Sequence, residues 1–244
     1  MTRLRTLGLA LLTVFMLGNS TTDSCPPPTA NLGIKRVPQE QPLWCWAAVG
    51  QLTMNYVSPA SNVTQCDEAN KAADAATPTC CQAMQTGVDP YPQSCKLAGF
   101  PDYHHYMFDA LNSNPNPKSQ ATAAPLSWPE LQRQIGCLGV PVAFAWHYAG
   151  TGGHMMTAVG YDTVDDVNFV VIDDSADKET QGPEVHEAES TSAAAAHAAG
   201  APALKGEQTY ITYDAYKQDP AAGPGHPATY LHWVDYSNIK YVGN

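Results

Sequence analysis

The chain has 244 residues and a formal net charge of −11, from 12 Lys and Arg against 23 Asp and Glu. Such an acidic chain excludes nucleic acids and anionic membrane surfaces as expected partners, because both repel negative charge. The length suits one large domain, or one domain with two lobes.

The N-terminal residues are typical of an export signal. Arg3 and Arg5 form a basic start, and residues 7–17 form an apolar stretch that is too short for a membrane span. We therefore expect residues 1–24 to be a signal peptide. The mature protein is then secreted or periplasmic and has no membrane association.

The next predicted elements surround a cysteine. Pro-rich residues 25–38 predict an extended segment, and small and apolar residues at helical spacing predict a helix over 46–56, directly after Cys45. The positive end of a helix dipole stabilises a thiolate, so Cys45 is a candidate nucleophile. Gln39, six residues upstream, carries side-chain N–H groups suited to holding an oxyanion, and Gln41 is an alternative.

Seven cysteines are present, an odd number for an exported chain. One free thiol and three disulfides is the simplest arrangement, with Cys45 as the free thiol. Four cysteines crowd into residues 66–95 and predict a disulfide-stapled segment, but no pairing follows from the sequence. Adjacent Cys80 and Cys81 lack the C-x-x-C spacing of zinc sites, so we expect neither a metal nor a cofactor.

Short helices are expected at 66–75 and 106–111. Residues 112–117 (NSNPNP) strongly disfavour regular structure and predict a boundary. A helical lobe of about residues 25–117 then precedes a β lobe of about residues 118–244.

The second half predicts an antiparallel sheet. Ser127 and Glu130 have the spacing of a capping box for a helix that runs to Ile135. Short apolar runs then predict strands at 141–146, 154–161, 168–172, 209–213 and 230–236. The polar and then Ala-rich residues 178–206 predict a surface excursion. The expected fold class is α+β.

A catalytic thiol needs an imidazole base and a group that orients the imidazole. His154 is the preferred base, because the glycines before it leave room for a substrate backbone and it opens a predicted strand. His147 is its rival. The orienting acid is expected at the end of the next strand, where alternation puts Asp174, rather than Asp173, on the buried apolar face.

Several segments in a fixed order carry a resemblance to a known family: Gln39-x5-Cys45-Trp46-Ala47-Ala48, Leu126–Ile135 leading into Pro141-Val142, Gly152-Gly153-His154 to Gly160-Tyr161-Asp162, and Val171–Asp174. They cover most of residues 37–175. The chain resembles papain-like cysteine peptidases, specifically the bacterial secreted branch related to staphopains and double-glycine peptidases. Two features depart from that pattern. Ser175-Ala176 follows the strand-end acid where Pro or Trp is usual, and residues 178–206 are atypical.

The resemblance implies a two-lobed papain-like fold with Cys45 as nucleophile, His154 as base, Asp174 or Asp173 as orienting acid and Gln39 as oxyanion donor. The implied function is a secreted thiol endopeptidase that acts on a peptide or protein through an acyl-enzyme. Two alternatives are an acyl transferase of transglutaminase type and a papain-fold binding module without turnover. Export itself, a separate protein inhibitor or residues 178–206 are the expected means of control.

Overall fold

The computed structural model describes residues 25–60, 62–73, 79–87, 93–95, 120–148, 152–176, 208–217 and 230–239, with Ala194, Ala196, Ala198, Gly200, Ala201 and Leu204. The predicted signal peptide, the helix expected at 106–111 and the boundary expected at 112–117 lie outside the described residues. Within the described part of the chain, no helix has the length and apolarity needed to cross a membrane.

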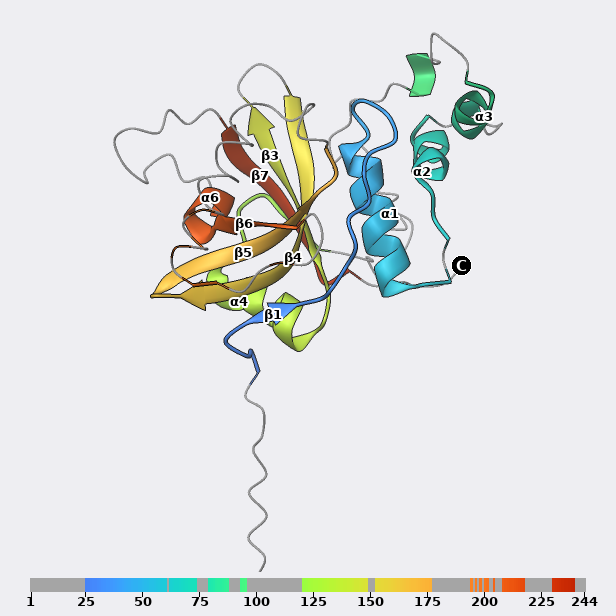
Figure 1. Cartoon of the computed structure of the whole chain (residues 1–244). Helices are drawn as coiled ribbons and strands as arrows, with labels where there is room; N and C mark the ends of the chain where they lie inside the picture. The colour runs from blue at the N-terminus through green and yellow to red at the C-terminus, as the bar shows by residue number, and fades with distance from the viewer. Residues whose placement is uncertain are drawn as a thin grey trace, which may run out of the picture.

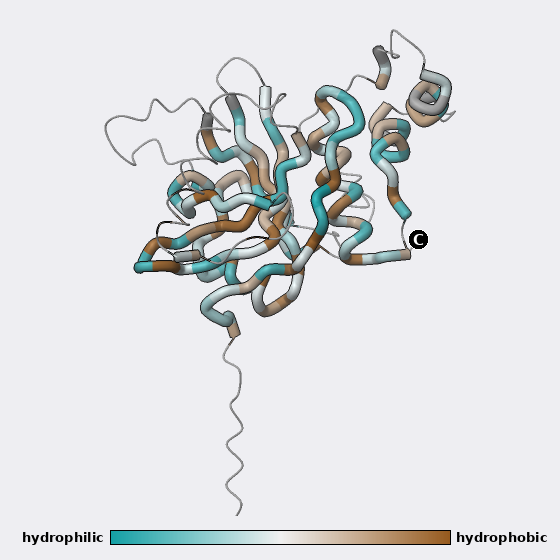
Figure 2. Tube along the Cα trace, viewed as in Figure 1, coloured by the Kyte–Doolittle hydropathy of each residue, from teal (hydrophilic) through white to brown (hydrophobic). Residues whose placement is uncertain are grey.

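The fold is α+β, as predicted, with an antiparallel sheet of seven strands between helices (Figure 1). All five strands expected from the sequence are present, and two short ones add to them. The sheet order is β2 (Gln120–Thr122), β7 (Tyr230–Ser237), β3 (Val142–Tyr148), β4 (Gly152–Val164), β5 (Val167–Asp174) and β6 (Thr209–Thr212), and β1 (Ala30–Asn31) pairs with β4. Apolar residues concentrate in the central strands, which are brown in Figure 2.

Helix α1 (Cys45–Val57) covers one face of the sheet, and the helix predicted at 46–56 is confirmed. Ala47 and Val49 of α1 lie in one buried cluster with Ala145 of β3 and Met155 of β4. Small side chains at the front of the helix allow close approach to the strands. This packing holds the first turn of α1 against the sheet.

The other face is covered by α4 (Trp128–Gln132), η3 (Arg133–Cys137) and α6 (Tyr213–Lys217). Leu131, Ile135 and Tyr216 from these helices share a buried cluster with Phe144 and Trp146 of β3. The indole N–H of Trp146 also donates to the Tyr216 carbonyl at 3.3 Å. The sheet is therefore enclosed on both faces, as an α+β core requires.

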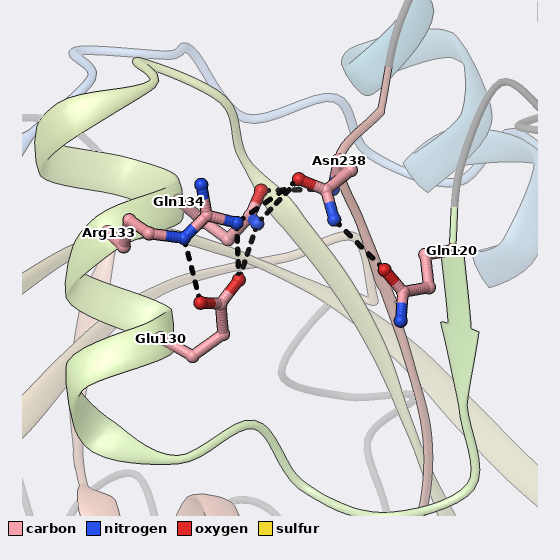
Figure 3. Close-up of polar contacts among 5 residues, drawn as sticks. All are labelled: Gln120, Glu130, Arg133, Gln134 and Asn238. Carbon is pink, nitrogen blue, oxygen red and sulfur yellow. Dashed lines mark hydrogen bonds and ion pairs between the residues drawn. The ribbon is translucent and has the colours of Figure 1, made fainter.

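The capping box predicted for α4 is wrong. Ser127 is the N-cap residue, but its side chain makes no capping hydrogen bond. Glu130 instead accepts hydrogen bonds from Arg133 Nε at 2.8 Å and Gln134 Nε2 at 2.7 Å (Figure 3). Gln134 also bonds twice to Asn238, through its Nε2 to Oδ1 and its Oε1 to the backbone N–H, each at 2.9 Å. These contacts hold Gln134 of η3 to Asn238, the residue that follows β7.

Three disulfides and one free thiol account for the seven cysteines, as predicted. Cys66–Cys81 and Cys80–Cys95 staple α2 (Gln65–Ala72), α3 (Thr79–Thr86) and η1 (Gln93–Cys95). Cys25–Cys137 joins the N-terminal segment to η3. Cys45 is the free cysteine.

The structure describes a few positions of the Ala-rich stretch. Ala194, Ala196 and Ala198 are helical. Ala196 is fully buried in a cluster with Phe169 and Val171 of β5. Ala194 and Ala198 are exposed, so the surface excursion predicted for residues 178–206 stays a prediction, and Ala196 packs on the sheet.

Candidate active site

Cys45 is the first residue of α1, and its side chain is 9 % exposed. Trp44 and Trp46 on either side of it are fully buried, so both are core residues. The Trp44 indole N–H donates to the Cys95 carbonyl at 2.9 Å, which anchors the start of the helix to the disulfide-bonded segment. The positive end of the α1 dipole therefore lies at a fixed thiol.

The chain reaches Cys45 through a strained turn. Leu43 has φ = 72° although it is not glycine, and its side chain is 52 % exposed. The turn is closed by a hydrogen bond of 3.2 Å from the Trp44 N–H to the Gln41 carbonyl. Left-handed backbone in a bulky residue costs about 1–2 kcal/mol. Such strain is typical of functional sites, and here it lies two residues before the thiol.

His154 and Asp174 form a buried pair. Strands β4 and β5 are neighbours, and their register sets Asp174 opposite Met156, two residues after His154. His154 Nε2 donates to Asp174 Oδ1 at 2.7 Å, and the two side chains are 13 % and 6 % exposed. The same Oδ1 accepts the Ala176 N–H at 2.8 Å. These two hydrogen bonds to Oδ1 fix the direction of the carboxylate.

The Cys45 side chain is the other neighbour that acts on the His154 ring. Burial acts to lower the pKa of His154, but the charge and hydrogen bond of Asp174, with the contact to Cys45, raise this pKa well above its usual value. Because Nε2 is engaged by Asp174, Nδ1 is the ring nitrogen left for the thiol. The arrangement therefore favours a protonated imidazole between the sulfur and the carboxylate.

The alternative base and acid have different surroundings from the His154–Asp174 pair. His147 pairs with Gly153, and its ring packs edge-on against Trp233 with centroids 4.9 Å apart. Asp173 pairs with Thr157, and its side chain is 2 % exposed. Asp174 and Cys45, rather than these two residues, are the groups that affect the pKa of His154. The structure brings together Cys45, His154 and Asp174.

The two glycines before His154 serve different purposes. Gly152 has φ = 105°, which disfavours other residues, and a Cβ there meets nothing within 4 Å. A Cβ on Gly153 instead lies 2.8 Å from the Trp146 carbonyl and 3.0 Å from the Trp233 ring. The prediction was that both glycines leave room for a substrate backbone. Of the two, only Gly152 has such open space beside it. The space beside Gly153 holds Trp233, which no sequence pattern marked.

Both candidate oxyanion donors lie in the segment that leads to Cys45, and both are partly exposed. The backbone N–H of Gln39 donates to the Ser175 carbonyl at 2.9 Å, which holds Gln39 beside the residue that follows Asp174. Gln41 contributes its carbonyl to the turn before α1. Gln39 is therefore the candidate whose backbone is bonded to the Asp174 segment.

One group of metal-type ligands occurs among the described residues. The ligand atoms of Cys66, Asp67 and Cys81 all lie within 4.8 Å of one another. The two sulfurs are joined in a disulfide, which removes the thiolates that a metal needs.

Neither a protein-family model nor a curated protein sequence matches this chain. A functional interpretation therefore depends on the residues and contacts described above.

Proposed function

We propose that the chain is an exported thiol endopeptidase with a two-lobed papain-like fold, in which Cys45, His154 and Asp174 form the catalytic triad. The observation that carries the proposal is that His154 contacts both Asp174 and Cys45, the one cysteine outside the disulfides. The position of the thiol at the start of a buried helix supports the same role.

In this mechanism the Cys45 thiolate attacks the carbonyl carbon of a peptide bond, and a C–S bond forms as the oxygen becomes negative. The backbone N–H of Cys45 and the Gln39 side chain hold this oxyanion. His154 transfers its Nδ1 proton to the amine as the C–N bond breaks. Water then attacks the thioester and gives a proton to His154, and the acid product leaves with the thiolate restored.

The proposed location outside the cytoplasm has two supports. Three disulfides suit an oxidising compartment. The basic and apolar N-terminal sequence suits a signal peptide. The substrate is a peptide or protein, and an acidic chain gives no reason to expect nucleic acid.

Hydrolysis of an unfolded protein by matched variants tests this function. Cys45→Ala abolishes cleavage and labelling by an epoxide thiol inhibitor, because the nucleophile is gone. His154→Ala lowers the rate by about 10²–10⁴-fold, the usual contribution of a general acid–base. His147→Ala, on the adjacent strand, keeps near wild-type activity and is the control. Cleavage by the Cys45→Ala variant would rule out the mechanism.

The same assay with an added primary amine separates the alternatives. A peptidase releases peptides at a rate that the amine changes little. Incorporation of the amine in excess of hydrolysis would identify an acyl transferase. The absence of both reactions, with ordinary thiol reactivity at Cys45, would identify a binding module.

A further inference from the structure

One arginine binds the backbone that follows the proposed catalytic acid. The segment between β1 and α1 runs alongside α1 before it turns into the first residues of the helix (Figure 1). Within this segment, Arg36 Nε donates to the Asp174 carbonyl at 2.5 Å. Its Nη2 donates to the Ala176 carbonyl at 2.6 Å and lies 3.4 Å from the Ser175 carbonyl. Arg36 therefore contacts three successive carbonyls.

These carbonyls belong to the turn that orients the Asp174 side chain. The Ala176 N–H donates to Asp174 Oδ1, the oxygen that also accepts from His154. The position of Ala176 therefore affects the direction of the carboxylate. Three residues after Arg36, the Gln39 N–H bonds to the Ser175 carbonyl from the same segment.

We propose that Arg36 is a positioning residue of the active site: it holds the turn 174–176 so that Asp174 faces His154, and it fixes this turn relative to Gln39. The proposal rests on the catalytic roles given above to Asp174 and Gln39. The planar guanidinium suits the task, because its fixed fork of donors reaches two carbonyls at once, whereas the single ammonium of lysine has no such fork.

The effect of Arg36 is transmitted through the imidazole. Asp174 from β5 and Cys45 from α1 are the groups whose contacts raise the pKa of His154. If the turn loosens and the carboxylate moves away, the protonated imidazole loses stabilisation and deprotonates at lower pH. A purely structural role for Arg36 lowers stability without moving this titration.

Alkylation of Cys45 by iodoacetate and by iodoacetamide measures the titration without any substrate. The imidazolium attracts the anionic reagent but not the neutral one, so the ratio of the two rates falls as His154 deprotonates. In Arg36→Gln, we expect the midpoint of this fall to move down by about one pH unit. Arg36→Lys moves it less, and kcat falls more than KM rises in both variants. Arg133→Gln, which breaks the partly exposed pair with Glu130, leaves the midpoint unchanged.

A folded Arg36→Gln protein with the wild-type midpoint overturns the positioning role, while the proposed function stands. If thermal melting shows that Arg36→Gln does not fold, Arg36→Lys decides, and a midpoint equal to the wild-type value overturns the proposal. A wild-type protein whose rate ratio does not change with pH contradicts the thiolate–imidazolium pair itself. That result rejects the proposed function, independently of Arg36.

Discussion

Two adjacent aspartates at the end of β5 have different surroundings. Asp174 bonds to His154, whereas Asp173 is buried opposite Thr157. Their chemistry is identical, so only the direction of the side chain distinguishes the aspartate that bonds to His154 from its neighbour.

Neutral substitutions at the two positions therefore have different effects. Asp174→Asn removes the charge that raises the pKa of His154, so this pKa falls. The protonated imidazole is then lost at lower pH, and the alkaline limb of kcat/KM moves down. Asp173→Asn leaves that limb in place. Rates measured across pH for both folded variants check the difference, and an equal displacement in both contradicts the role of Asp174.

At the residue scale, strand alternation was enough to favour Asp174 over Asp173, and the structure pairs Asp174 with His154. Arg36 escaped notice because its acceptors are backbone carbonyls as far as 140 residues along the chain, and no side-chain pattern marks such acceptors. The packing role of Gly153 was missed for a similar reason. It depends on Trp233, which lies beside Gly153 in the fold but far from it in the sequence.

Strand β4 carries His154, and its first residues depend on close packing. Alanine at Gly153 would set a Cβ 2.8 Å from the Trp146 carbonyl, so either β3 or β4 must shift. We expect Gly153→Ala to cost about 1–3 kcal/mol of unfolding free energy, as overpacking usually does. It also lowers kcat, because His154 is the next residue.

Urea unfolding and steady-state rates test this prediction together. Gly33→Ala is the control, because Gly33 also resists substitution, through its φ of 65°, but has open space around it and lies outside the triad. Both variants lose stability, and only Gly153→Ala loses turnover at conditions where both are folded. Equal turnover in the two variants would contradict the account of β4.

Among the elements, those with a long periodic pattern were predictable. Helix α1 and strands β3, β4 and β5 follow the expected ranges closely, because each is a long run of mostly apolar, buried residues. Helix α3 and the shorter elements α6, β1 and β2 were not predicted. Segments as short as β1, β2 and α6 show too little periodicity, and tertiary contacts decide their structure. The Ser127 capping box failed, and Glu130 accepts from Arg133 and Gln134 instead.

The three disulfides close chain loops of two very different lengths. Cys25–Cys137 spans 112 residues, whereas Cys66–Cys81 and Cys80–Cys95 each span 15. A longer loop loses more conformational freedom in the unfolded state when it is closed. The long-range bridge also anchors the segment that carries Arg36 and Gln39.

Removing the long-range bridge should therefore destabilise the protein more than removing a short one. Cys25→Ser/Cys137→Ser costs roughly 4–5 kcal/mol, and Cys66→Ser/Cys81→Ser costs about 3 kcal/mol. Urea unfolding of both, in a Cys45→Ala background that prevents thiol exchange, measures the difference. If removing Cys25–Cys137 lowers the unfolding free energy less than removing Cys66–Cys81, the prediction is contradicted.

At the scale of the molecule, composition and strand pattern were sufficient for the α+β class and for three disulfides with one free thiol. The pairing was not predictable, because it depends on which cysteines the fold brings within bonding distance. The burial of Ala196 in the Ala-rich stretch was not predictable either, since it comes from strands that are distant in sequence.

The central claim is that folding joins a thiolate at the start of α1 to a protonated imidazole on β4. The most direct test is the rate of Cys45 alkylation by iodoacetamide from pH 4 to 9, in wild type and in His154→Ala. An ordinary thiol, with a pKa of about 8.5, slows about tenfold for each pH unit below that value. We expect the wild-type rate to stay nearly level into the acidic range, and His154→Ala to restore the steep fall. A steep fall in the wild type, identical to that of the variant, would contradict the central claim.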